Sequence, residues 1–251
     1  MAITGHAHSE ACPVLIRGSF IMTDKLNIVL VHGAFADGSH WRHIIPRLYQ
    51  AGHRVMAAQN PLTSLADDIA NTRKLAEWMG GPTLLVGHSY GGAVITGAGR
   101  ATNVVGLVYL AAFAPAQGES LNSILAGSDP APGLASISPA FDDDFLWHRQ
   151  DTFHDAFCQD LDDTESLIMA TTQRPLARRC FDDVTREPAW NTKPSWYQVS
   201  AQDRMIPPQT QRKMAERIHA RETIELDTSH ASFATRPTQV LELITNAAAA
   251  V

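Results

Sequence analysis

A serine flanked by glycines is the first feature of this sequence that could do chemistry. Ser89 lies in the run Gly87-His88-Ser89-Tyr90-Gly91, with a glycine two residues before it and another two residues after it. Small neighbours are needed where a strand turns sharply into a helix, and such a turn holds the serine hydroxyl out above the end of the sheet. A serine can also simply cap a helix, so the pattern alone leaves both interpretations open.

A nucleophilic serine needs a base to take its proton, and two later residues could supply that base and its acid. Histidine is the usual base, and a carboxylate fixes the tautomer of its ring. Asp203 follows the predicted strand 195–200, and His230 follows the predicted strand 222–226. Because the carboxyl ends of parallel strands meet at one edge of a sheet, we expect Ser89, Asp203 and His230 to form a catalytic triad there.

Three other aspartates compete with Asp203 for the role of acid. Asp182 and Asp183 follow no predicted strand, and Asp227 shares a short loop with His230, from which a reach across the imidazole ring is awkward. Asp203 could itself form an Asx-turn instead. We place Asp203 first among the four.

Attack on a carbonyl creates an oxyanion, which needs two N–H donors held in advance. One donor is expected from Tyr90, the residue after the nucleophile. The other is expected from the loop after the strand 26–31, where Gly33 lets the backbone approach closely. Ala34 is our first choice for this donor and Phe35 the second.

These residues need a scaffold of parallel strands, and the chain alternates between strand and helix patterns accordingly. The predicted strands are residues 26–31, 53–58, 83–87, 104–112, 195–200 and 222–226. The predicted helices are residues 41–51, 64–79, 208–219 and 238–249. The alternation predicts a mostly parallel sheet of about six strands, covered by helices on both faces.

The alternation stops between residues 115 and 192, where proline, aspartate and aromatic residues are frequent. We interpret this segment as an insertion that forms a small helical cap over the sheet. Its large apolar side chains, together with Phe35, are expected to line a substrate pocket, although some of them must form the core of the cap. The expected lining residues are Phe35, Phe141, Phe145, Trp147, Phe153, Phe157, Met169 and Trp190.

Composition narrows the class of protein. The chain has 251 residues, of which 45% are hydrophobic, enough for one domain with a substantial core. Its net charge of −6 favours neither a nucleic-acid partner nor an anionic membrane surface. No apolar run approaches the roughly 18 residues that span a bilayer. No nucleotide-binding glycine motif is present, and no third ligand completes a metal site with His40 and His43, so we expect neither cofactor nor metal.

The first 21 residues do not fit the fold. They contain no continuous apolar stretch of signal-peptide length, and a second methionine, Met22, is followed by polar residues and then by the first predicted strand. We expect residues 1–21 to be an extension, natural or not, and residues 22–251 to form the folded domain. Three widely spaced cysteines, Cys12, Cys158 and Cys180, indicate reduced thiols and a cytoplasmic protein.

Six segments together give the sequence a family resemblance. They are VHGAFADGSHW, QNPLTSLADDI, GHSYGG, VYLAAFAPAQGES, QDRMIPP and TSHASF. From about Lys25 onward the chain resembles the α/β-hydrolase superfamily, and most of all its compact bacterial esterases and the plant methylesterase/hydroxynitrile lyase group. The resemblance implies the α/β-hydrolase fold, a helical cap and the triad of Ser89, Asp203 and His230.

The expected function is hydrolysis of carboxylic esters through an acyl-enzyme, acting on small to medium hydrophobic substrates. The expected partners are an ester and water, with no nucleic acid and no membrane, and the protein is expected as a monomer or homodimer. The resemblance also admits a binding protein with little or no catalysis, or a cofactor-free lyase or haloperoxidase. Against a cyanohydrin lyase, Ala231 follows His230 where the plant lyases of the group have a lysine, and Gly33 follows His32 where they have a threonine.

Overall fold

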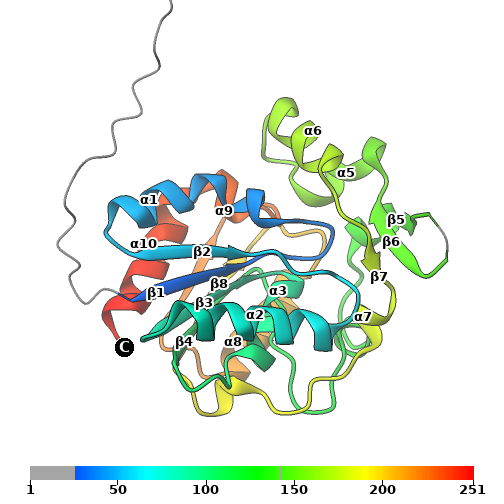
Figure 1. Cartoon of the computed structure of the whole chain (residues 1–251). Coiled ribbons are helices and arrows are strands. Elements are labelled where there is room, and N and C mark those ends of the chain that lie inside the picture. Colours follow the sequence, from blue (N-terminus) through cyan, green and yellow to red (C-terminus); the bar gives the residue numbers. More distant parts are fainter. Residues whose placement is uncertain (1–25, 142) are drawn as a thin grey trace, which may run out of the picture.

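Six parallel strands form the central sheet of this protein. The computed structural model describes residues 26–141 and 143–251 (Figure 1). The strands are β1 (Asn27–Val31), β2 (Arg54–Ala58), β3 (Thr83–His88), β4 (Val104–Leu110), β8 (Ser195–Ser200) and β9 (Thr223–Leu226). Their order across the sheet is β2-β1-β3-β4-β8-β9, and every neighbouring pair is parallel. The predicted α/β-hydrolase sheet is therefore confirmed.

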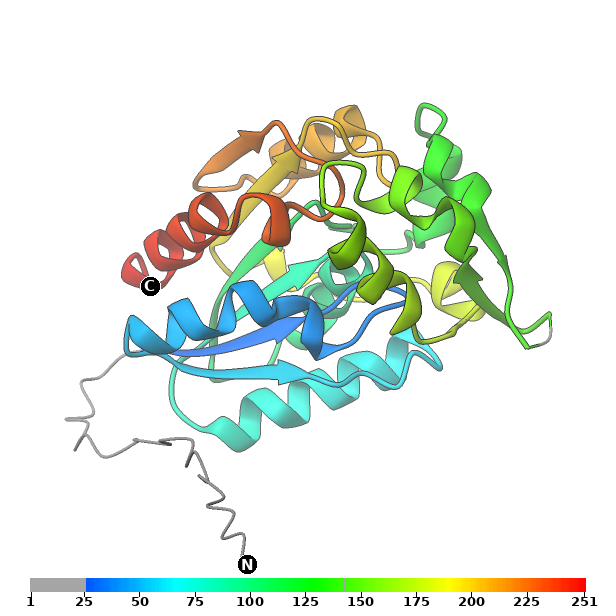
Figure 2. The ribbon, with the colours of Figure 1, turned by 90° about the horizontal axis from the view of Figure 1, so that it is seen from above.

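Helices cover both faces of this sheet, as parallel strands require (Figures 1 and 2). One face carries α2 (Leu65–Met79), α3 (Tyr90–Ala98) and α8 (Pro208–Arg217). The other face carries α10 (Pro237–Ala249) with α1 (Ile45–Gln50) beside it, and the short α9 (Ser232–Thr235) leads into α10. The predicted helix 41–51 is split, because a 3₁₀ turn (Gly38–His43) precedes α1.

The central strands bury both of their faces. In β1, Val29 and Val31 pack in one apolar cluster with residues of α2 and α3, whereas Ile28 and Leu30 pack in a second cluster with Trp41 and residues of α10. This alternation explains why the central strands are continuous apolar runs in the sequence. It also holds the carboxyl ends of β1, β3, β8 and β9 in a fixed arrangement at one edge.

The chain between β4 and β8 leaves the sheet and forms the cap at that edge (Figure 2). Its helices are α4 (Leu121–Ala126), α5 (Gln150–Phe157), α6 (Asp163–Thr171) and α7 (Arg179–Asp182), with 3₁₀ turns at Pro132–Ser136 and Ala189–Asn191. The cap also contains a small antiparallel sheet of β5 (Ile137–Pro139), β6 (Phe145–His148) and β7 (Leu176–Ala177). A purely helical cap was expected. Strands of two to four residues are too short to show an alternating pattern in the sequence, and these form because distant segments pair.

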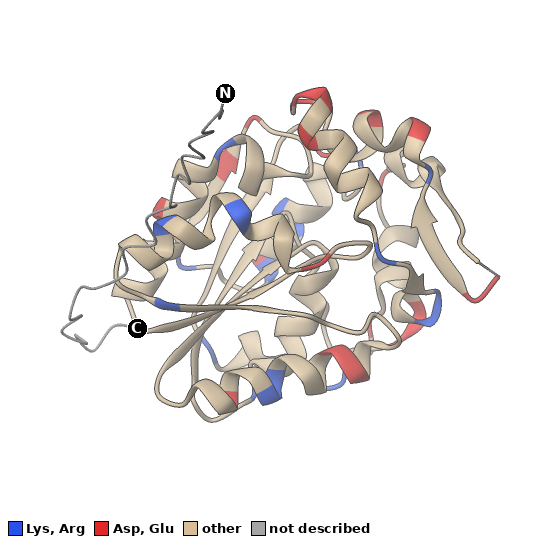
Figure 3. Cartoon of the chain, turned by 45° about the horizontal axis from the view of Figure 1, so that its top comes forward, with Lys and Arg blue, Asp and Glu red and all other residues tan. Residues whose placement is uncertain are grey.

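Some expectations concern residues outside this description. Residues 1–21 and Cys12 lie outside the described residues, while Cys158 and Cys180 are buried free thiols. Among residues 26–141 and 143–251, no helix has both the length and the apolar character to cross a bilayer. Figure 3 shows acidic and basic residues on many elements of the described chain, both on the helices around the sheet and on the cap.

Candidate active site

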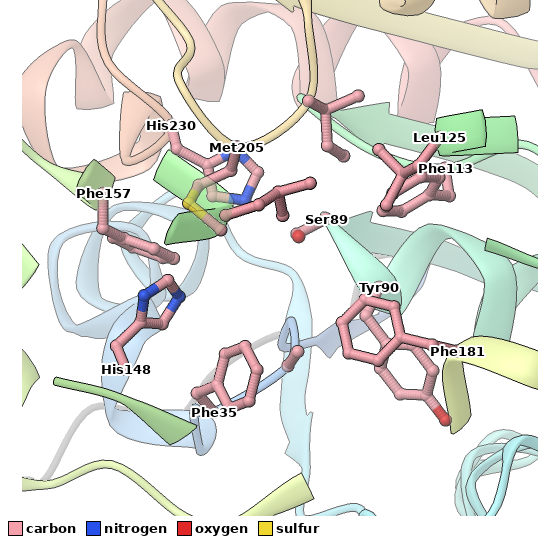
Figure 4. Close-up of a pocket in the computed structure, with 13 residues that line it drawn as sticks. Phe35, Ser89, Tyr90, Phe113, Leu125, His148, Phe157, Phe181, Met205 and His230 are labelled. Atoms are coloured by element: carbon pink, nitrogen blue, oxygen red, sulfur yellow. The ribbon is translucent and has the colours of Figure 1, made fainter. Parts of the chain in front are cut away.

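Ser89 sits in a strained turn between β3 and α3. Its backbone has φ 54° and ψ −124°, a conformation that costs a non-glycine residue energy and is held by the surrounding structure. The two flanking glycines make the turn possible. A Cβ added to Gly87 would lie 2.6 Å from the carbonyl oxygen of Gly91, and one added to Gly91 would lie 2.6 Å from that of His32. The expected corner is thus present, and Ser89 faces a pocket beneath the cap (Figure 4).

His230 and Asp203 meet at the same edge of the sheet, from the loops after β9 and β8. His230 Nδ1 lies 2.6 Å from Asp203 Oδ2, and both side chains are almost completely buried. Because the carboxylate can only accept, Nδ1 carries the proton, and Nε2 keeps the lone pair that a general base needs. Figure 4 shows the hydroxyl oxygen of Ser89 on the side of the pocket that faces the His230 ring.

Four donors surround the Asp203 carboxylate. Oδ1 accepts hydrogen bonds from the backbone N–H groups of Met205 (2.7 Å) and Ile206 (3.0 Å). Oδ2 accepts from Gln211 Nε2 at 2.7 Å in addition to His230. This set stabilises the ionised carboxylate in a buried position. Gln211 was not predicted, and no motif marks it, because it lies on α8 and reaches Asp203 only in the folded chain.

The three competing aspartates lie elsewhere. Asp182 accepts a hydrogen bond from Asn122, and Asp183 accepts one from the backbone N–H of Leu65. Asp227 accepts one from the exposed side chain of Gln202. Among the four, the structure brings only Asp203 into contact with His230.

The loop after β1 contains Ala34, the residue expected to supply the second N–H donor. His32 Nδ1 lies 2.9 Å from the Gly33 carbonyl oxygen, and His32 Nε2 accepts from the backbone N–H of Asn60 at 3.2 Å. Burial lowers the pKa of His32 to about 4, so the ring is neutral and Nδ1 donates to Gly33. In a trans peptide the N–H points away from the preceding carbonyl oxygen, so the amide of Ala34 points away from His32.

Ala34 and Tyr90 both line the pocket beside Ser89. Within the described residues, neither backbone N–H is assigned a hydrogen-bond acceptor. The Tyr90 hydroxyl donates to the buried carboxyl of Asp68 at 2.6 Å, which fixes the position of Tyr90, the residue expected to supply the other N–H donor. Burial raises the pKa of Asp68 to about 6. Sequence reasoning missed Asp68, which reads as an ordinary acidic residue in the first turn of α2.

His230 packs against an aromatic wall. Its ring centroid lies 4.6 Å from that of His88 and 4.9 Å from that of Phe157. His88 Nε2 lies 2.9 Å from the His230 carbonyl oxygen, and burial keeps the pKa of His88 well below its usual value. His88 is therefore a neutral donor that holds the loop of His230 in place.

A narrow pocket, partly open to solvent, lies in front of Ser89. Apart from Ser89 and two histidines, its lining side chains are apolar or aromatic. They are Ala34, Phe35, Tyr90, Phe113, Leu125, Leu134, Phe157, Phe181, Met205 and Ile206, with His148 and His230. Of the eight residues expected from the sequence, Phe35 and Phe157 lie in this lining.

The other six expected lining residues lie elsewhere, which corrects that part of the prediction. Phe153 and Met169 are fully buried in the packing of α5 and α6, whereas Phe141 is 77% exposed. The indole N–H of Trp190 donates to the Pro115 carbonyl oxygen at 3.1 Å, away from the pocket lining. The remaining two, Phe145 and Trp147, lie outside the lining because side chains alternate in direction along β6.

Along β6, successive side chains point to opposite faces. Phe145 and Trp147 therefore share one face, and His148 points the other way, into the pocket. Sequence reasoning chose the aromatic residues of this strand by type. In the folded chain it is the neighbouring residue His148 that lines the pocket.

The described part of the chain contains no cluster of three or more metal-ligating side chains. The two histidines considered for a metal site do not form one. His40 is buried against Phe233, with ring centroids 5.7 Å apart, and His43 contacts Glu165 at 3.2 Å. His40 is buried because the 3₁₀ turn directs it into the core.

Known proteins that are similar in sequence to this chain include an esterase and a pyrethroid hydrolase. A carbendazim hydrolyzing esterase from Nocardioides sp. (strain SG-4G) is 35% identical over 129 residues, which are 46% of this chain and 53% of that protein. The match thus spans only about half of that esterase. A pyrethroid hydrolase from Sphingobium wenxiniae (strain DSM 21828 / CGMCC 1.7748 / JZ-1) is 25% identical over 250 residues, which cover 87% of this chain and 86% of that protein.

Solved structures show the same fold at low sequence identity. A pyrethroid hydrolase from Sphingobium faniae JZ-2 superposes with a TM-score of 0.75 at 22% identity, covering 90% of this chain and 98% of that one. A methylesterase from Arabidopsis has a TM-score of 0.74 at 20% identity, covering 90% and 100%. The model of the alpha/beta hydrolase family matches residues 28–243, which is most of the sequence. This chain therefore belongs to the alpha/beta hydrolase family.

Proposed function

We propose that this protein is a serine hydrolase that cleaves carboxylic esters through an acyl-enzyme. One observation carries the proposal: Ser89 in its strained turn shares a pocket with His230, whose ring is held by the buried Asp203 at 2.6 Å. A positioned serine, a neutral histidine and a carboxylate behind it are the parts that acyl transfer requires. The relatives named as a carbendazim hydrolyzing esterase and a pyrethroid hydrolase support this reaction class.

The reaction has two stages in this proposal. His230 Nε2 takes the proton of Ser89 as the hydroxyl attacks the ester carbonyl carbon, and the N–H groups of Ala34 and Tyr90 receive the oxyanion. Collapse of the tetrahedral intermediate breaks the bond to the alcohol, which leaves with the proton from His230. Water, deprotonated by His230, then attacks the acyl-enzyme and releases the acid and free Ser89. Asp203 stays ionised and stabilises the imidazolium in both stages.

The pocket supports a hydrophobic substrate of small to medium size. Its lining side chains are mostly apolar, as in most sites that bind small hydrophobic ligands. We propose an ester and water as the reactants, with neither metal nor organic cofactor. A cytoplasmic location and a monomeric or dimeric state remain predictions.

Substitution of the nucleophile tests the proposal. Ser89→Ala should lower kcat on p-nitrophenyl esters by several orders of magnitude, and a fluorophosphonate should label the wild-type protein at Ser89. Ser39→Ala, which changes an exposed serine, is the matched control and should keep both labelling and turnover. If the wild type shows no multiple turnover on any ester while it still binds apolar ligands, the protein is a binding protein and the proposal fails.

A further inference from the structure

A cap histidine, His148, faces the same pocket as the proposed catalytic residues. It ends β6, is only 1% exposed, and lines the pocket together with Ser89 and His230. Figure 4 shows one of its ring nitrogens turned toward the space in front of Ser89. The catalytic steps proposed above give His148 no task, although it is a hydrogen-bonding side chain in an otherwise apolar part of the lining.

The position of His148 is tightly fixed. Its backbone N–H donates to Gln173 Oε1 at 2.8 Å, and Gln173 Nε2 donates back to the His148 carbonyl oxygen at 3.1 Å. The ring packs edge-on against Phe35, with centroids 4.8 Å apart, and against Phe153 at 5.5 Å. The imidazole is therefore held in one orientation, as a group that recognises a ligand should be.

The hydrogen bonds of Ser136 determine which ring nitrogen of His148 carries the proton. Ser136 Oγ lies 2.9 Å from the carbonyl oxygen of Gly133 and also contacts His148 Nδ1. A carbonyl oxygen can only accept, so the Ser136 hydroxyl donates to Gly133. Nδ1–H must then donate to Ser136 Oγ, which leaves Nε2 with a free lone pair.

The ring also stays neutral. Burial, followed by repulsion from His230, lowers the pKa of His148 to about 3. At neutral pH Nε2 is therefore an acceptor and not a cationic donor.

His148 Nε2 has no hydrogen-bond partner among the described residues, although it is buried. A buried acceptor without a partner costs roughly 1–3 kcal/mol. We propose that Nε2 accepts a hydrogen bond from the substrate, so that His148 selects esters bearing an O–H or N–H donor close to the scissile carbonyl. This inference rests on the proposed function and narrows its substrate class to hydrophobic esters with such a donor.

Two esters that differ by one hydroxyl group test the proposal. Methyl mandelate carries an O–H on the carbon next to the ester carbonyl, whereas methyl phenylacetate has a hydrogen there. The kcat/KM of each mandelate enantiomer is divided by that of the phenylacetate, and this selectivity is compared between wild type and His148→Phe. The comparison cancels the different intrinsic reactivities of the two esters. We expect the selectivity of the preferred enantiomer to fall about 10-fold in His148→Phe.

Two further variants separate recognition from packing. His148→Gln retains an acceptor oxygen and should keep more of the selectivity than His148→Phe. His154→Phe changes another cap histidine, which is 38% exposed and absent from the pocket lining, and should leave the selectivity at the wild-type value. Equal selectivity in wild type and His148→Phe, with ester hydrolysis retained, would overturn this inference and leave the proposed function standing.

A measurement on the wild type alone covers the case in which His148→Phe does not fold. Mandelamide and phenylacetamide differ by the same hydroxyl group and can be compared as competitive inhibitors. Mandelamide should inhibit several-fold more strongly, and equal inhibition constants would overturn the inference. Absence of any Ser89-dependent ester hydrolysis would instead refute the proposed function.

Discussion

The carboxylate of Asp203 gives the sharpest test of the triad, because Asp203→Asn keeps the shape of the side chain and removes its charge. Each carboxylate oxygen accepts from two donors: Oδ1 from Met205 and Ile206, and Oδ2 from Gln211 and His230. An amide NH₂ group in either orientation therefore faces two N–H donors. If it faces His230, Nδ1 can accept only by giving up its proton, and Nε2 then carries the proton and can no longer take that of Ser89.

The expected fall in kcat follows from the loss of the negative charge on Asp203. A carboxylate and an imidazolium about 4 Å apart attract by about 4 kcal/mol at an effective dielectric constant of 20, which corresponds to about 10³ in rate. The wrong tautomer adds to this loss, and the same change in a serine protease triad costs about 10⁴. We expect kcat on p-nitrophenyl esters to fall by about 10³ to 10⁴ in Asp203→Asn.

The assay compares Asp203→Asn with Asp182→Asn and Asp183→Asn, together with the melting temperature of each variant. The two control variants should retain activity within a few-fold of wild type, because their carboxylates contact Asn122 and the backbone of Leu65 and not His230. A loss below about 10-fold in a folded Asp203→Asn protein, or a larger loss in either control, would refute the assignment of the acid.

Four further outcomes follow from the structure. Gly91→Ala should destabilise the protein by about 2 kcal/mol or more in urea unfolding, because the new Cβ would lie 2.6 Å from the carbonyl oxygen of His32, whereas Gly127→Ala, with its nearest atoms 3.8 Å away, should not. The folded pKa of Asp68, about 6, lies above the usual value of 3.8, so its stabilising contribution is full below pH 3.8 and is lost as pH rises through 6. Relative to Asp68→Asn, the wild type should lose about 1.5 kcal/mol of stability between pH 5 and pH 8, and parallel curves would contradict the burial argument. Mandelonitrile should release no benzaldehyde above the buffer rate, since Ala231 supplies no cation for cyanide, and rapid Ser89-dependent release would indicate a lyase. EDTA should leave ester hydrolysis unchanged, and a loss restored by zinc would show that a metal takes part.

Much of the body of this protein could be predicted because its signals are local. The predicted strands 26–31, 83–87 and 195–200 match β1, β3 and β8 within a residue, since strands buried on both faces carry apolar residues on each face. Helix α2 begins and ends where Ser64 and Gly80 cap it. The order of serine, aspartate and histidine after successive strands located the pair that the structure brings together at 2.6 Å.

The cap was harder to predict because its elements depend on contacts between distant segments. β6 pairs with both β5 and β7, and the segments they join are too short to show a period. Its register places His148 in the pocket and turns Trp147 away from it, so choosing lining residues by type failed there. A shift of one residue along this strand would have reversed that choice.

By itself, the sequence determined the parallel sheet, the strained corner at Ser89 and the positions of Asp203 and His230, because each depends on a residue type placed at the end of a recognisable element. Only the tertiary structure decided which partners hold them. Gln211 reaches Asp203 from α8, Asp68 anchors Tyr90 from α2, and His148 enters the pocket from β6. These contacts depend on how elements far apart in the chain pack together, which the spacing of residues along the sequence does not predict.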